Sequence, residues 1–164
     1  MKLDANGYKA LHAREGLKLK PYLDTEGIAT IGFGNTYYLD GRKVKMSDRA
    51  LTTAEAIELG KVIPDDFAKF VDSKLKKTVT QDQFNALVSI CYNIGKTGFA
   101  NSTMLRLINI DPNDIKIADA IAMWRKNEEV RSRRANELKQ YFNYLLANEP
   151  TRLYIDKVIK SKLT

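Results

Sequence analysis

The chain has 164 residues, of which 44% are hydrophobic and 29% are charged, a composition typical of a folded globular protein. The single cysteine excludes an intramolecular disulfide. The chain also has only one histidine, so a metal site is not expected, and no other cofactor is expected either. The net charge of +7 is concentrated in residues 116–164, which hold 11 basic and 6 acidic residues, and it favours a polyanionic partner without identifying one.

The first third of the chain predicts a helix followed by a small antiparallel sheet. A helix is expected from Asp4 to about Glu15, where Gly16 supplies a stop signal. Residues 17–20 alternate between leucine and lysine, and the proline that follows favours an edge strand. Residues 28–33 favour a second strand after the turn at 24–27. The pair Asp40-Gly41 is typical of another hairpin turn, so the sheet is expected to have two or three strands.

From residue 52 onward the pattern is helical. Thr52 and Glu55 have the spacing of a capping box, as have Thr80 and Gln83. Helices are therefore expected after these boxes, and also over residues 64–77, 102–109, 111–124, 133–146 and 150–163. The whole chain is interpreted as one α+β domain, mostly α. A sheet-bearing lobe would span about 13–63, a connecting helix 64–77, and a helical lobe 1–12 and 78–164, with a cleft between the lobes.

Two carboxylates in the first third of the chain have environments suited to different roles. Glu15 falls at a helix C-terminus, where the helix dipole and partial burial disfavour a negative charge, so it is expected to keep its proton as a general acid must. Asp24 stands beside a polar turn and is expected to stay ionised. Glycoside hydrolysis uses such a pair across the bond that breaks.

Thr30 stands on the strand that folds back toward Asp24, and its hydroxyl could help hold a water molecule. Gly32 and Gly34 leave room for a sugar ring to approach the backbone. Each feature alone has an ordinary explanation, as a helix end, turn chemistry or strand propensity. Their order and spacing together make a catalytic hairpin the better hypothesis.

The segment from Glu15 to Gly34 resembles the active-site hairpin of phage-type lysozymes, glycoside hydrolase family 24. Asp24 lies nine positions after Glu15, Thr30 six after Asp24, and Ile31-Gly32-Phe33-Gly34 follows. The resemblance implies a lysozyme-like fold in which Glu15, Asp24 and Thr30 are catalytic. It covers about residues 4–146, and it departs from the family pattern at residue 35, which is Asn35 where the family often has His.

Two further blocks are similar to this family. Residues 83–103 resemble its central helix and following loop, which implies that Tyr92 and Ser102 contact substrate. The resemblance implies the same role for Thr36, which follows Gly34 closely in the hairpin block. Trp124 and the basic stretch after it resemble a region from which an arginine reaches toward the catalytic glutamate, so Arg131 and Arg133 are candidates for that role.

The sequence is therefore interpreted as an endolysin that hydrolyses the β-1,4 bond between N-acetylmuramic acid and N-acetylglucosamine in peptidoglycan. Water activation by Asp24 would invert the anomeric centre, whereas direct attack would retain it. A lytic transglycosylase, which needs no water, remains an alternative. A basic helical nucleic-acid-binding domain is another, although acidic side chains in its site would repel phosphates.

The expected partners are glycan strands, with no nucleic acid, and the chain is expected to be a monomer. No stretch approaches the ~20 apolar residues of a membrane span, and the N-terminus lacks the apolar run of a signal peptide. Stable membrane insertion is therefore not expected. Family analogy implies accumulation in the host cytoplasm, release through a holin, and action on the cell wall in the periplasm.

Overall fold

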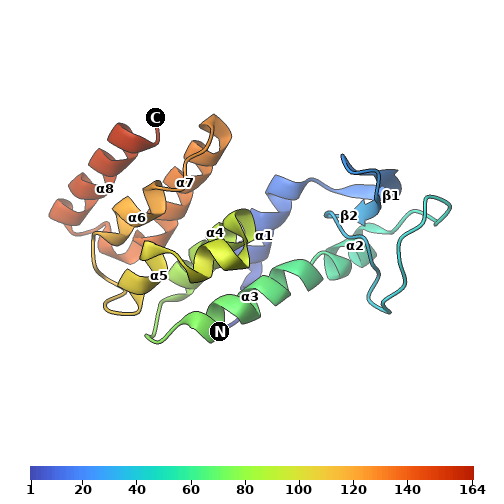
Figure 1. Cartoon of the computed structure of the whole chain (residues 1–164), viewed down its shortest axis with the longest axis horizontal. Helices are drawn as coiled ribbons and strands as arrows, with labels where there is room; N and C mark the ends of the chain where they lie inside the picture. The colour runs from blue at the N-terminus through green and yellow to red at the C-terminus, as the bar shows by residue number, and fades with distance from the viewer. The chain divides into compact units, whose positions relative to one another are not determined.

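The structure, a computed structural model, describes residues 1–164 and divides the chain into two compact units (Figure 1). The sheet-bearing unit comprises residues 5–66, and the helical unit comprises residues 1–4 and 67–164. The sheet-bearing unit thus takes in the whole first helix, whereas the expected lobe boundary fell inside it. The predicted α+β class is confirmed, because the chain is mostly helical with one small antiparallel sheet.

The sheet-bearing unit begins with a helix that leads directly into a hairpin. Helix α1 (Ala5–Glu15) ends as predicted, because Gly16 adopts a left-handed φ of 70° and donates its N–H to the carbonyl of His12. Strands β1 (Lys18–Leu23) and β2 (Ala29–Gly32) pair antiparallel, with Tyr22 opposite Thr30. The possible third strand does not form: residues 37 and 43 make only an isolated bridge, so the sheet has two strands.

Helix α2 (Thr53–Leu59) packs against β2 and completes this unit. Both reciprocal bonds of the predicted capping box between Thr52 and Glu55 are present. The core beneath the hairpin joins residues from the sheet, the following loop and α2: Ile31, Val44, Leu51, Ala56 and Leu59. The hairpin therefore depends on contacts with a segment that follows it by about twenty residues.

Gly60, which follows α2, leaves space for two stacked rings. His12 and Phe33 lie with ring centroids 4.0 Å apart, and a His12 ring nitrogen is 2.9 Å from the Gly60 carbonyl. A Cβ at residue 60 would stand 2.5 Å from Cδ2 of Phe33 and 3.0 Å from Nε2 of His12. The backbone there is right-handed helical (φ −65°), so the constraint on residue 60 is steric rather than conformational.

We expect Gly60→Ala to destabilise the protein by about 1–3 kcal/mol, because overpacking outweighs the gain in helix propensity. The measurement is the free energy of unfolding in urea. Adding Phe33→Leu to the Gly60→Ala variant should recover part of the loss, because the smaller side chain vacates the contested space. A Gly60→Ala variant as stable as the parent would contradict this account.

Helix α3 (Val62–Lys74) starts two residues before and ends three residues before the predicted 64–77. Its proline is accepted inside the first turn, where backbone N–H groups have no intrahelical partner. The early end has a tertiary cause: the Asn109 side chain donates to the carbonyl of Lys74 (3.0 Å) and accepts from the N–H of Lys76 (2.7 Å). An asparagine more than thirty residues away therefore caps this helix.

Helix α4 (Gln81–Ala100) is the central element of the helical unit, and residues 83–91 are all buried. The predicted capping box at Thr80 is confirmed. Gly95 interrupts the helix with φ 81°, a conformation that a side chain would strain. Gly98 lies against the Trp124 ring, so the last turn of α4 approaches the segment before α7 closely.

The helical unit continues with four α-helices: α5 (Thr103–Ile108), α6 (Ile117–Ala122), α7 (Glu128–Tyr141) and α8 (Glu149–Lys162). Helices α5 and α7 pack against α4, and α6 packs against α5, α7 and α8. Figure 1 shows α6, α7 and α8 running beside one another. The ranges predicted for α5 and α8 are confirmed within one residue at each end. No helix in the chain is both long and apolar enough to cross a membrane.

The predicted bounds of α6 and α7 were wrong. The expected helix over 111–124 begins only at Ile117, because the side chains of Asp111 and Asp114 accept hydrogen bonds from backbone N–H groups two residues on and hold turns instead. Helix α7 begins five residues before the predicted 133, where Asn127 caps it by accepting from the N–H of Val130 (2.9 Å). The first turn of α7 is charged, so the spacing of apolar residues did not indicate where the helix begins.

Candidate active site

The turn between β1 and β2 is built around the carboxylate of Asp24. One carboxylate oxygen, Oδ1, accepts hydrogen bonds from the N–H groups of Glu26 (2.9 Å) and Ile28 (2.8 Å). Backbone bonds close the same turn, from Asp24 N–H to the Ile28 carbonyl (3.0 Å) and from Gly27 N–H to the Asp24 carbonyl (3.1 Å). The carboxylate is therefore fixed in orientation, and its Oδ2 accepts no hydrogen bond from the chain.

Thr30 is held just as firmly on β2. It is only 2% exposed, and its Oγ1 donates to the carbonyl of Ile28 at 2.9 Å. Because that bond uses the hydroxyl proton, the oxygen retains only acceptor capacity. Ile28 thus connects the two predicted residues, with its N–H bonded to Asp24 and its carbonyl to Thr30.

Glu15 is the last residue of α1, immediately before the left-handed Gly16. Its side chain is exposed, so the partial burial expected for it is wrong, and it forms no hydrogen bond or ion pair within the chain. An exposed carboxyl group without a structural partner contributes little to folding stability.

Tyr22 is a member of this site that sequence reasoning missed. Burial raises the pKa of its phenol, and the negative charges of Asp24 and then Glu15 raise it further. The phenol is therefore within electrostatic range of both carboxylates. Because Tyr22 pairs with Thr30 across the sheet, their side chains share one face, and the Lys18 ammonium lies 4.0 Å from the ring centroid. The cross-strand register was the signal that could have identified Tyr22.

The three predicted substrate contacts occupy different settings. Thr36, in the sheet-bearing unit, accepts the N–H of Val44 at its carbonyl (2.9 Å) and is half-buried. Tyr92, in the helical unit, packs against the Phe67 ring at a centroid distance of 5.0 Å. Ser102 caps α5: its hydroxyl accepts from the N–H of Leu105 (3.1 Å) and donates to the Phe99 carbonyl (2.8 Å).

Among the basic residues of α7, the arginine with the most partners is one that the sequence did not single out. Arg134 is fully buried and forms an ion pair with Glu137, which is also fully buried. Its other nitrogens donate to the Asn93 side chain and to the Trp124 carbonyl (3.1 Å), while Ser89 donates to Glu137. The predicted candidates Arg131 and Arg133 are half-buried, and Nε of Arg131 has no hydrogen-bond partner.

Comparison with known proteins gives one consistent result. Residues 12–137 match the family described as Phage lysozyme. The chain is 38% identical over 126 residues to an endolysin of Salmonella phage P22, a match covering 77% of this chain and 85% of that one.

Solved structures agree with the sequence matches. An endolysin from Escherichia coli O157:H7 phage FAHEc1 is 33% identical with a TM-score of 0.77, covering 88% of this chain and 95% of that one. A mutant of P22 lysozyme is 35% identical with a TM-score of 0.72, and the match covers 84% of this chain and 99% of that one.

Proposed function

Because this chain belongs to the phage lysozyme family, we propose that it cleaves the β-1,4 bond between N-acetylmuramic acid and N-acetylglucosamine with Glu15 as the proton donor. The chain is a phage endolysin, a glycoside hydrolase that degrades peptidoglycan, so the predicted enzyme class and lysozyme-like fold are confirmed. The family match, and not the net charge, identifies the class, which leaves the nucleic-acid-binding alternative without support.

The observation that best supports this mechanism is the shared anchoring of Asp24 and Thr30 on Ile28. Oδ2 of Asp24 and Oγ1 of Thr30 are both acceptors, so together they could take the two hydrogens of one water molecule. The water's lone pair would then point toward the sugar. Asp24 removes a proton as the water attacks, while Glu15 protonates the leaving oxygen. The phenol of Tyr22, whose pKa is raised by burial and by both carboxylates, could orient substrate or water.

We further propose that Thr36 and Tyr92 contact the glycan. Both bonding roles of the Ser102 hydroxyl are already engaged within the chain, so its contribution would come mainly through holding the start of α5. The chain is proposed to act as a monomer on the cell wall in the periplasm, after accumulating in the host cytoplasm and leaving it through a holin. These points rest on family analogy.

Product analysis in ¹⁸O-labelled water tests this proposal. Purified sacculi are digested, and the new glycan ends are examined by mass spectrometry and proton NMR. Hydrolysis predicts one labelled oxygen at each new reducing end, and the water-mediated route predicts the inverted α-anomer first. Unlabelled 1,6-anhydro ends would show a lytic transglycosylase, and an initial β-anomer would show direct attack by the protein.

A further inference from the structure

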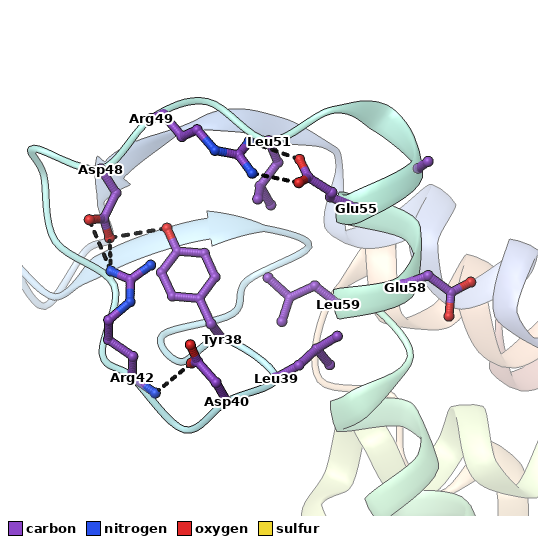
Figure 2. A pocket seen from close by; sticks show the side chains of 11 residues that line it. Tyr38, Leu39, Asp40, Arg42, Asp48, Arg49, Leu51, Glu55, Glu58 and Leu59 are labelled. Carbon is purple, nitrogen blue, oxygen red and sulfur yellow. Dashed lines mark hydrogen bonds and ion pairs between the residues drawn. The ribbon is translucent and has the colours of Figure 1, made fainter.

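A pocket of about 590 Å³ lies in the sheet-bearing unit, between the loop over residues 38–51 and helix α2 (Figure 2). Glu15, Asp24 and Thr30 do not line it. Its volume falls within the range of about 300–1,000 Å³ that is common for small-molecule sites. The pocket is therefore separate from the predicted catalytic residues, and their chemistry does not account for the residues that line it.

The inner wall of the pocket is apolar and includes an aromatic ring. Leu51 and Leu59 are nearly fully buried at its base, whereas Leu39 at its mouth is 69% exposed. Figure 2 shows the Tyr38 ring between Arg42 and Leu59. Arg42 lies 4.2 Å from the ring centroid, and the ring lines the same pocket as Leu39, Leu51 and Leu59. A ring face beside aliphatic side chains suits a ligand with a flat apolar surface.

Four of the six charged residues of the lining form two ion pairs, while Glu58 pairs with Lys61 outside the pocket and Asp40 accepts from the backbone N–H of Arg42. Arg42 donates to both oxygens of Asp48 (3.0 and 3.1 Å), and Asp48 also accepts from the Tyr38 hydroxyl (3.1 Å). Arg49 binds both oxygens of Glu55, joining the loop to α2. Hydrogen bonds from Arg49 and then from the Thr52 N–H lower the pKa of Glu55 to about 2, so this pair stays ionised under ordinary conditions.

Ion pairs of this kind can form hydrogen bonds with a ligand, and their opposite charges largely cancel in the electrostatic field that the ligand experiences. The sheet-bearing unit holds 9 of the 27 basic and 9 of the 20 acidic residues and is neutral, which leaves 18 basic and 11 acidic residues in the helical unit. All of the +7 charge therefore belongs to the helical unit. The pocket lining itself has four carboxylates and two guanidinium groups, so it disfavours an anionic ligand and suits an uncharged, hydroxyl-rich one, whereas polyanions would be drawn to the helical unit.

We propose that this pocket is a second glycan site, which binds an N-acetylated amino sugar of a peptidoglycan strand away from the bond being cut. The inference rests on the proposed function, since it assumes that glycan strands are the substrate. The sugar's apolar face would pack on Tyr38, its acetamido methyl against Leu39 and Leu59, and its hydroxyls against the paired carboxylates and guanidinium groups. A charged stem peptide fits less well, because both guanidinium groups are engaged by carboxylates of the pocket itself.

The pocket is connected to the catalytic hairpin through its walls. The N–H of Leu51 donates to the carbonyl of Leu19 on β1 (2.9 Å), and the Leu59 carbonyl accepts from Asn35 just after β2 (3.2 Å). A strand held in the pocket would therefore be tethered to the same rigid core as Asp24 and Thr30. Tethering raises the effective concentration of an insoluble polymer at the catalytic residues without any change in the chemical step.

The first test maps binding by amide chemical shifts on the full chain carrying Glu15→Gln, so that the ligand is not cut. Chitotetraose, an uncharged β-1,4 oligomer of N-acetylglucosamine, is the probe, and the free stem tetrapeptide is the comparison. Two groups of shifts are expected with chitotetraose, one on the hairpin and one at Leu39, Ala54 and Leu59. Shifts confined to the hairpin, or pocket shifts produced by the tetrapeptide alone, would overturn the proposal.

The second test uses Leu39→Asp in the otherwise unaltered chain, with Leu153→Asp as the matched control. Both leucines are well exposed (69% and 59%), so neither change should unfold the protein, and thermal unfolding checks this. Leu39→Asp should weaken binding to insoluble sacculi by about tenfold and leave turnover of a soluble oligosaccharide within about twofold, while the control changes neither. Equal loss in both variants would mean general charge repulsion and would overturn the proposal.

These tests remain informative if the catalytic assignment fails. If Glu15 is not the proton donor, the Glu15→Gln variant will lyse cells as fast as the parent. If the pocket does not bind glycan, chitotetraose will cause no shifts there and Leu39→Asp will bind sacculi as the parent does. The two failures are therefore distinguishable.

Discussion

Replacing Glu15 by glutamine is expected to abolish lysis of chloroform-permeabilised bacteria while the thermal unfolding midpoint stays unchanged or rises. Glutamine has nearly the same shape but supplies no acidic proton, and general acid catalysis contributes about 10²–10⁴-fold to rate. The Glu15 side chain makes no hydrogen bond or ion pair in the chain, so no structural contact is lost. Whenever the parent Glu15 is ionised, its carboxylate interacts unfavourably with the dipole of α1, and glutamine removes that interaction.

Glu26→Gln is the matched control for this change. Glu26 is also an exposed glutamate of the sheet-bearing unit, close to the same hairpin, but only its backbone N–H takes part in the Asp24 turn. It should keep nearly full activity and stability. Lysis is followed by turbidity and unfolding by circular dichroism. A folded Glu15→Gln variant that lyses cells as fast as Glu26→Gln would remove Glu15 from the mechanism.

Breaking the buried ion pair of α7 should have the largest effect on stability. Arg134→Met leaves the carboxylate of Glu137 without its cation in a fully buried position, which typically costs about 3–5 kcal/mol. Arg134 also donates to Asn93 and to the Trp124 carbonyl, so acceptors on α4 and on the segment before α7 lose their donor as well. At about 2–4 °C per kcal/mol for a chain of this size, the unfolding midpoint should fall by about 6–20 °C.

Two further variants separate this explanation from a general loss of packing. Arg133→Met changes the neighbouring arginine, which is half-buried and has no ion pair, and should shift the midpoint little. The double variant Arg134→Met with Glu137→Leu should be more stable than Arg134→Met alone, because no charge is left buried by itself. Unfolding free energies from urea titrations give the coupling between the two residues. A double variant as unstable as the single one would contradict the assignment of the loss to the isolated carboxylate.

Local signals were sufficient where a short stretch of chain satisfies its own hydrogen bonds. Both capping boxes lie within four residues, and Gly16 ends α1 through its own backbone conformation, so these features were predicted correctly. The predictions failed where distant or competing groups decided the outcome. Asn109 ends α3 from another part of the chain, and the side chains of Asp111 and Asp114 hold turns where a helix was expected.

The sequence by itself determined the catalytic hypothesis, because the order and spacing of Glu15, Asp24 and Thr30 are properties of the chain, and the turn at Asp24 is closed by hydrogen bonds within five residues. Only the tertiary structure decided which other residues matter. Tyr22 enters the site through strand register, and Arg134 is the buried arginine because of the face that α7 presents to α4. The pocket beside α2 exists because a loop from 38–51 folds against that helix. Burial and ion pairing of these residues depend on long-range packing, which composition and periodicity do not specify.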